Sequence, residues 1–214
     1  WMTFNEINNQ RNVNLPWAAF TNSGVVYQDG EDRQAVLYQV AHHEFLASAK
    51  AVIEGHKINP DFKIGCMLAM TPVYPETCNP GDQVAALKEM DKSFFFGDVQ
   101  VRGHYPSYII KEDGDLDILA EGKVDYFAFS YYMSEATSCD PTHLIDRQGG
   151  FSKSVHNPYL KESDWGWAID PIGLRYILNV LQERYEVPLM VVENGIGLHE
   201  TPDPSDGMIH DDAR

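Results

Sequence analysis

The chain has 214 residues, in which 16 Lys and Arg stand against 32 Asp and Glu, so the formal net charge is −16 with neutral histidines. Such an acidic chain argues against nucleic acid or an anionic membrane as a partner, because both require a basic face. With 43% hydrophobic residues the chain can bury a core, and no apolar run approaches the roughly 20 residues that span a bilayer. We therefore expect a soluble, folded protein that binds neither nucleic acid nor membrane.

Short apolar runs alternate along the chain with longer amphipathic stretches. In chain order they predict a strand at residues 1–4, a helix at 35–57, a strand at 63–70, a helix at 80–96, a strand at 124–132, a helix at 170–185 and a strand at 188–192. The helix at 170–185 carries the clearest signal. Asp170 can cap its N-terminus, and Pro171 suits the first helical position.

The cysteines and histidines indicate no metal site. Cys66, Cys78 and Cys139 are odd in number and lack metal-ligand spacing, so we expect reduced thiols in a cytosolic chain. Adjacent histidines in a helix, such as His42 and His43, point about 100° apart, and no HExxH motif is present. The sequence therefore predicts neither a metal ion nor another cofactor.

Alternating strands and helices are typical of parallel α/β architecture, whose strands are buried on both faces. A doubly wound sheet and a (β/α)8 TIM barrel both fit this pattern. No Gly-rich fingerprint or P-loop follows a predicted strand, which weakens the nucleotide-binding doubly wound alternative. A whole barrel needs eight strands in about 250 residues. A barrel would therefore be partial, with about four βα units in one domain at residues 1–214, and Trp1 in place of Met also leads us to expect a piece of a longer protein.

Two of the predicted strands end in a glutamate flanked by asparagine. Asn5 and Glu6 follow the first strand, and Glu193 and Asn194 follow the last. Because the carboxyl ends of parallel strands lie at one edge of the sheet, where ligands bind in both architectures, the two glutamates can face one another across one cleft. Such a pair of carboxylates is what glycoside hydrolysis requires.

These two motifs resemble the paired signatures of glycoside hydrolase family 1, in which the first glutamate is the acid/base and the second is the nucleophile. Further segments resemble family blocks in the family's order, at residues 96–106 (FGDVQVRGHYP), 129–132 (FSYY) and 165–174 (WGWAIDPIGL). On the family's barrel they run from the fourth strand to just past the seventh. The resemblance therefore implies a partial barrel that lacks the first three strands and the eighth.

The resemblance also implies a role for five residues. Glu6 would protonate the glycosidic oxygen and later deprotonate water, while Glu193 would form the covalent glycosyl-enzyme. Asn5 would bond the sugar 2-hydroxyl, a contact that strengthens in the transition state. Tyr132 would donate a hydrogen bond to Glu193 and keep that carboxylate ionised. Trp167 would form one wall of the aglycone site.

Within the family, three features resemble the bacterial 6-phospho-β-glucosidases. Ser130 precedes the two tyrosines, residues 7–9 (INN) follow Glu6, and residues 97–106 have the character of the phospho-enzymes. The implied substrate is a β-glucoside phosphorylated at the sugar 6-position, and the implied location is cytoplasmic. The family's phosphate-binding loop would follow Arg214. A plain β-glucosidase, a 6-phospho-β-galactosidase and a catalytically inactive fragment therefore remain alternatives, and we expect residues 1–214 on their own to be inactive.

Overall fold

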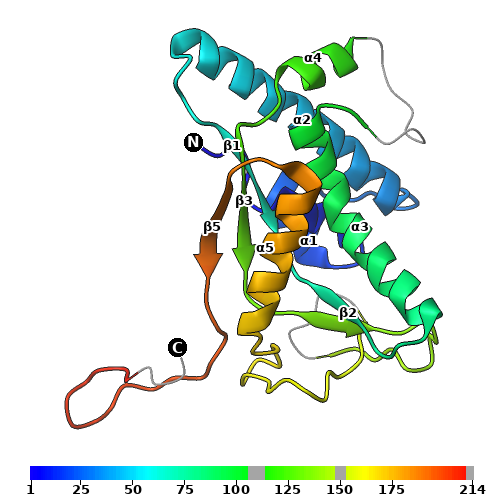
Figure 1. Ribbon diagram of the computed structural model, residues 1–214, viewed down its shortest axis with the longest axis vertical. Helices are drawn as coiled ribbons and strands as arrows, with labels where there is room; N and C mark the ends of the chain where they lie inside the picture. Colours follow the sequence, from blue (N-terminus) through cyan, green and yellow to red (C-terminus); the bar gives the residue numbers. More distant parts are fainter. Residues whose placement is uncertain (106–113, 148–152, 211–214) are drawn as a thin grey trace.

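The strands of the computed structural model, which describes residues 1–105, 114–147 and 153–210, form two parallel sheets. In the larger sheet β1 (Gly65–Ala69), β3 (Tyr126–Tyr131) and β5 (Leu189–Asn194) lie side by side in that order. Their arrows all point the same way in Figure 1. In the smaller sheet β2 (Val73–Pro75) pairs in parallel with β4 (Glu135–Thr137). The expected parallel arrangement is confirmed, although sequence analysis missed β2 and β4.

Three long helices connect and cover the strands: α2 (Arg33–Ile58), α3 (Pro80–Arg102) and α5 (Pro171–Tyr185). They confirm the three predicted helices, and α3 continues six residues beyond the predicted end at residue 96. Each begins at a residue whose side chain accepts hydrogen bonds from backbone N–H groups of the first turn, as helix starts require. These residues are Asp32, Asn79 and Asp170.

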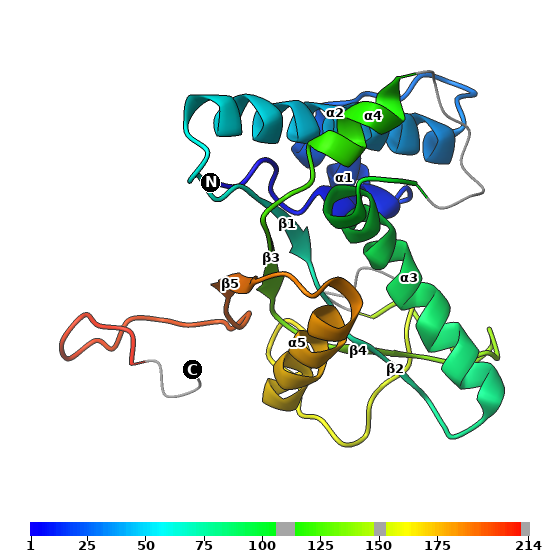
Figure 2. The ribbon, with the colours of Figure 1, turned by 45° about the horizontal axis from the view of Figure 1, so that its top comes forward.

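Three short helices were not predicted: η1 (Ile7–Arg11), α1 (Pro16–Ser23) and α4 (Asp115–Glu121). Figure 2 shows α4 against α2 and the segment after β5 extending away from the rest of the molecule. Within the described residues, none of the helices combines the length and apolarity that a membrane crossing needs.

The alternation of side chains along β3 separates the hydrophobic core from the opposite face of the sheet. Phe127 and Phe129 are fully buried and belong to the core cluster, together with residues of α3 and α5. The ring of Phe127 stacks on Tyr185 of α5 with 5.1 Å between centroids. Since successive strand residues point to opposite faces, Ala128 and Ser130 point away from these helices. Ser130 therefore lies on the face that carries the candidate site.

The predicted strand at residues 1–4 is wrong as a regular strand. Met2 makes one isolated parallel bridge to Gly65, and Thr3 donates a backbone hydrogen bond to the Gly65 carbonyl. The segment therefore runs beside β1 in the expected direction, but it bends already at Thr3 and Asn5, and Glu6 has a φ of 45°. A left-handed residue cannot continue a strand.

The last strand runs further than predicted. β5 includes Glu193 and Asn194, which sequence analysis placed after the strand. Its register with β3 shifts between Phe129 and Ser130: Phe129 pairs with Val191, whereas Ser130 pairs with Glu193. Val192 is therefore an extra residue, and such a bulge re-aims the side chains that follow it. The bulge brings Glu193, rather than Val192, opposite Ser130.

Candidate active site

Glu6 has an unusual backbone conformation that its surroundings hold in place. Its φ and ψ are both 45°, in the left-handed region that non-glycine residues rarely occupy and that occurs more often at functional sites. Asn22 of α1 donates from Nδ2 to the carbonyl oxygens of Asn5 and Glu6, at 3.1 Å each. The amide of Asn9 also donates to the Glu6 carbonyl at 2.9 Å. These contacts fix the backbone conformation of Glu6 and with it the direction of its side chain.

The helix that follows Glu6 is anchored to the carboxyl end of β1 by Asn8. This fully buried side chain donates from Nδ2 to the Ala69 carbonyl at 2.7 Å and accepts from the Ala69 amide at 2.8 Å. The side chain thereby continues the backbone hydrogen bonding of the strand. Glu6 is in consequence positioned at the strand edge where ligands bind in parallel α/β proteins.

Both carboxyl oxygens of Glu6 accept hydrogen bonds from buried residues. The Ser130 hydroxyl of β3 donates to Oε1, and Asn9 of η1 donates from Nδ2 to Oε2 at 2.8 Å. Ser130 is 1% exposed and Asn9 is 6% exposed. Sequence analysis noted both positions only as marks of a family resemblance. The contact between Ser130 and Glu6 joins residues 124 positions apart, so it leaves no local pattern in the sequence.

Glu193 is linked to the same group of residues. The Tyr132 hydroxyl donates to Glu193 Oε2 at 2.7 Å, so the structure contains the hydrogen bond expected from the sequence. Burial, this hydrogen bond and the negative charges of Glu193 and Glu6 raise the pKa of Tyr132 to about 12. Ser130, which donates to Glu6, is also the register partner of Glu193. The two glutamates therefore belong to one site.

The ring of Trp167 packs against Tyr132, with 5.6 Å between centroids, and Trp165 packs edge-on against Trp167 at 5.3 Å. Tyr132 thus has Glu193 at its hydroxyl and an indole at its ring. Trp167 therefore packs on the residue that contacts Glu193, and its role as one wall of the aglycone site stays a prediction.

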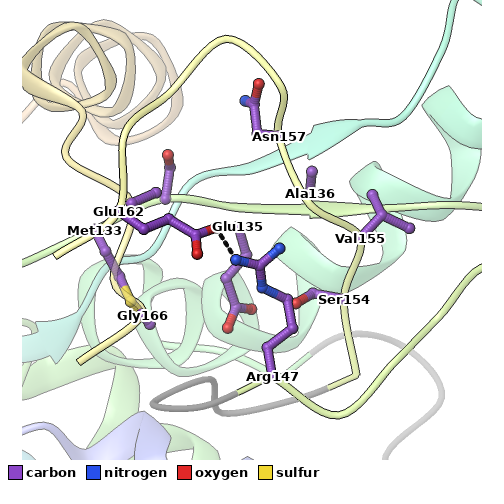
Figure 3. Close-up of a pocket in the computed structure, with 11 residues that line it drawn as sticks. Met133, Glu135, Ala136, Arg147, Ser154, Val155, Asn157, Glu162 and Gly166 are labelled. Carbon is purple, nitrogen blue, oxygen red and sulfur yellow. Dashed lines mark hydrogen bonds and ion pairs between the residues drawn. The ribbon is translucent and has the colours of Figure 1, made fainter. Parts of the chain in front are cut away.

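The segment that carries Trp167 is held by an ion pair. Figure 3 shows Arg147 directed at Glu162, which it contacts in a hollow of about 20 Å³ beside β4. The side chain of Arg147 is 15% exposed. A space this small accepts a water molecule but no sugar ring. Glu162 also forms a β-bridge with Ala168, the neighbour of Trp167, so its ion pair with Arg147 supports the position of Trp167. The hollow is not itself a substrate site.

Asn5 lies at a pocket of about 360 Å³, whose lining also includes Glu6, Asn9, Asn22 and Glu44. This volume is within the range of ligand pockets. The side chain of Asn5 is exposed. The structure therefore brings Asn5 and Glu6 to one pocket, beside a second carboxyl group that sequence analysis did not single out.

Glu44 makes the stability of the fold depend on pH. Burial raises its pKa from 4.5 to about 7, against a smaller opposite effect of the hydrogen bond from Gln10. As pH rises from 4.5 to 7, the unfolded chain ionises at Glu44 before the folded chain does, so the free energy of unfolding falls. We expect Glu44→Gln to stabilise the fold by about 1 kcal/mol at pH 8, after allowance for solvent screening, and not at pH 4.

Urea unfolding of the Glu44→Gln variant at the two pH values measures this difference. Glu183→Gln, which makes the same change at an exposed position of α5, is the control and should change neither value. An equal gain at pH 4 and pH 8 would contradict the assignment to the ionisation of Glu44.

The histidine that sequence analysis considered as a metal ligand serves a structural contact. His42 bonds the Tyr105 hydroxyl at 2.5 Å through Nδ1 and Asp115 at 2.9 Å through Nε2. Both ring nitrogens thus contact protein groups, Tyr105 in the segment after α3 and Asp115 in α4. This arrangement ties those elements to α2.

The comparisons with known proteins agree with the fold described above. The family model described as glycosyl hydrolase family 1 matches residues 1–214. The chain belongs to this family. The family 1 chain is 50% identical to aryl-phospho-β-D-glucosidase BglA of Bacillus subtilis (strain 168) over 100% of its own length and 47% of that protein. It is 42% identical to 6-phospho-β-glucosidase AscB of Escherichia coli (strain K12), with coverage of 100% and 46%. The chain thus spans about half the length of these curated relatives.

Solved structures show the fold of this family 1 chain. The β-glucosidase from Thermotoga maritima in complex with glucoimidazole superimposes with a TM-score of 0.77 at 23% identity, over 100% of this chain and 47% of that one. The family 1 β-glucosidase from the same organism gives a TM-score of 0.76 at 22% identity. The predicted partial (β/α)8 barrel is confirmed, and the doubly wound alternative is excluded.

Proposed function

We propose that the protein is a retaining glycoside hydrolase with Glu6 as acid/base and Glu193 as nucleophile. The observation that carries the proposal is the connection through β3: Ser130 donates to Glu6 and pairs in register with Glu193. Two carboxyl groups at one strand edge, each with its own hydrogen-bond donors, are what double displacement at an anomeric carbon requires.

The reaction would proceed in two steps. In the first, the Glu193 carboxylate attacks the anomeric carbon while Glu6 gives its proton to the departing glycosidic oxygen, which leaves a covalent ester on Glu193. In the second, Glu6 removes a proton from water, the water oxygen attacks the same carbon, and the Glu193 carboxylate departs. Two displacements retain the anomeric configuration, and this mechanism needs about 5–5.5 Å between the carboxyl groups.

Three further residues would orient the substrate and the nucleophile. The Tyr132 hydroxyl, 2.7 Å from Glu193, favours the ionised carboxylate that must attack. Asn5 at the Glu6 pocket would bond the sugar 2-hydroxyl, and the indole of Trp167 would pack on the aglycone ring. No step uses a cofactor.

The proposed substrate is a β-glucoside that carries phosphate on the sugar 6-hydroxyl. Its support is the similarity over the whole chain to proteins named aryl-phospho-β-D-glucosidase and 6-phospho-β-glucosidase, at 50% and 42% identity. A doubly charged phosphate ester does not cross a bilayer unaided, because its charge is too costly to desolvate. We therefore propose that the protein acts in the cytoplasm.

Hydrolysis of matched aryl substrates by the purified protein tests this function. We expect kcat/KM for p-nitrophenyl 6-phospho-β-glucoside to exceed that for the unphosphorylated β-glucoside by about 100-fold or more, the equivalent of one strong contact to the phosphate. The first product in ¹H NMR should be the β-anomer. Preference for the plain β-glucoside or the 6-phospho-β-galactoside would replace the substrate assignment, and absence of turnover would favour an inactive chain.

A further inference from the structure

The two donors that hold the Glu6 carboxyl differ in chemistry. Asn9 reaches Oε2 with an amide nitrogen, which can only donate, while Ser130 reaches Oε1 with a hydroxyl, which can donate or accept. Neither donor is free to turn to solvent, because Ser130 is 1% exposed and Asn9 is 6% exposed. The carboxyl group is therefore held asymmetrically.

This asymmetry matters because the proposed acid/base must be protonated at one step and ionised at the next. When Glu6 is ionised, both partners donate to it. When it is protonated, a proton on Oε2 would oppose the N–H of Asn9, whereas a proton on Oε1 can be donated to Ser130 after that hydroxyl rotates. Both protonation states thus keep every hydrogen bond only when the proton is on Oε1.

We propose that Ser130 and Asn9 are positioning residues that determine which oxygen of Glu6 carries the catalytic proton. Asn9 keeps Oε2 unprotonated, and Ser130 accepts a hydrogen bond from the proton on Oε1 until that proton passes to the leaving oxygen. Ser130 is the register partner of Glu193, so this proton lies on the side of Glu6 that faces the nucleophile's strand. The inference rests on the proposed function, because it assigns Glu6 the acid/base role.

Other charged or titratable groups near Glu6 come from three elements. Glu193 belongs to β5, Tyr132 follows β3, and Glu44 of α2 lines the same pocket as Glu6. Among the residues that the structure describes, none of these three donates a hydrogen bond to the Glu6 carboxyl, whose donors are Asn9 and Ser130. Burial raises the pKa of Glu44 to about 7, so Glu44 is replaced by glutamine in the spectroscopic measurement below.

Dependence on the leaving group separates a role through Glu6 from a general structural role. For Ser130→Ala we expect kcat/KM to change less than about threefold with 2,4-dinitrophenyl 6-phospho-β-glucoside, whose leaving group needs no proton. With the methyl glycoside we expect a loss of about tenfold or more, since one charge-assisted hydrogen bond is lost. Asn9→Leu, which removes the amide at similar volume, should show the same pattern.

Ser48→Ala is the matched control. Ser48 is also 1% exposed, and its hydroxyl contacts Thr3 and Gln100 rather than Glu6. This variant should affect both substrates equally. An equal loss on both substrates in Ser130→Ala would overturn the inference, because it would place the effect on Glu193 or on folding.

A second measurement does not depend on turnover. In protein labelled with ¹³C at glutamate carboxyls and carrying Glu44→Gln, the Glu6 resonance is identified by its loss in Glu6→Gln. The chemical shift of that resonance at pH 8 should change when Ser130→Ala removes the hydroxyl that contacts Oε1, and it should stay the same in Ser48→Ala. An unchanged chemical shift in Ser130→Ala overturns the inference, whereas a changed one in a protein without glycosidase activity would overturn the proposed function alone.

Discussion

Glu193→Gln is expected to lower kcat by at least about 10⁴-fold, because the amide cannot attack the anomeric carbon. Glutamine matches glutamate in shape, and its carbonyl oxygen can still accept the hydrogen bond that Tyr132 donates at 2.7 Å. The loss should therefore be chemical, with no change in the unfolding midpoint. Steady-state hydrolysis of an aryl 6-phospho-β-glucoside measures it.

The same amide substitution elsewhere provides the control for Glu193→Gln. Glu183 is an exposed carboxylate on α5, away from the strand edge. Glu183→Gln should retain full activity. Activity of Glu193→Gln within about tenfold of the unchanged protein would remove Glu193 from the role of nucleophile.

Glu6→Ala should give a different pattern, because the residue transfers protons and forms no bond to the sugar. Turnover of an unactivated substrate should fall by about 10²–10⁴-fold, the range of general acid–base catalysis. An activated aryl substrate should still form the glycosyl-enzyme on Glu193, and added azide should replace water as the second nucleophile. We expect azide to restore turnover at least about tenfold with a β-glycosyl azide as product, as judged by NMR.

The stereochemistry of rescue decides which glutamate has which role. Azide rescue that yields the β-glycosyl azide at Glu193→Ala and the α-glycosyl azide at Glu6→Ala would mean that the two roles are exchanged. The hydrogen-bond partners favour the assignment given: Glu193 receives a tyrosine hydroxyl that stabilises its ionised form, whereas Glu6 has a serine hydroxyl that can follow a proton.

Local sequence patterns predicted most of the framework. The apolar run at residues 63–70 contains β1, and the 3.6-residue period after Asp170 matches α5, whose N-terminal cap is Asp170 as expected. These features depend on residues a few positions apart, and periodicity and capping record such interactions directly. The short strands β2 and β4, with three residues each, were missed because so few residues establish no period.

Of the contacts within the candidate site, sequence analysis predicted the hydrogen bond from Tyr132 to Glu193 and missed the others. Glu6, Glu193 and the Tyr132 hydrogen bond followed from strand ends and from the family resemblance. The left-handed conformation of Glu6 has no signature of its own, because Asn22, which lies on another element, holds it. The anchoring of η1 by Asn8 likewise exists only once β1 is beside it.

By itself, the sequence determined the order of the main strands and helices, the acidic surface, and the two glutamates that parallel topology would bring to one edge. The tertiary structure alone decided how that edge is assembled. The bulge at Val192 sets Glu193 opposite Ser130, and the Ser130 hydroxyl reaches Glu6 from a strand far along the chain. Such contacts depend on strand register and side-chain direction, which arise only when the strands pair.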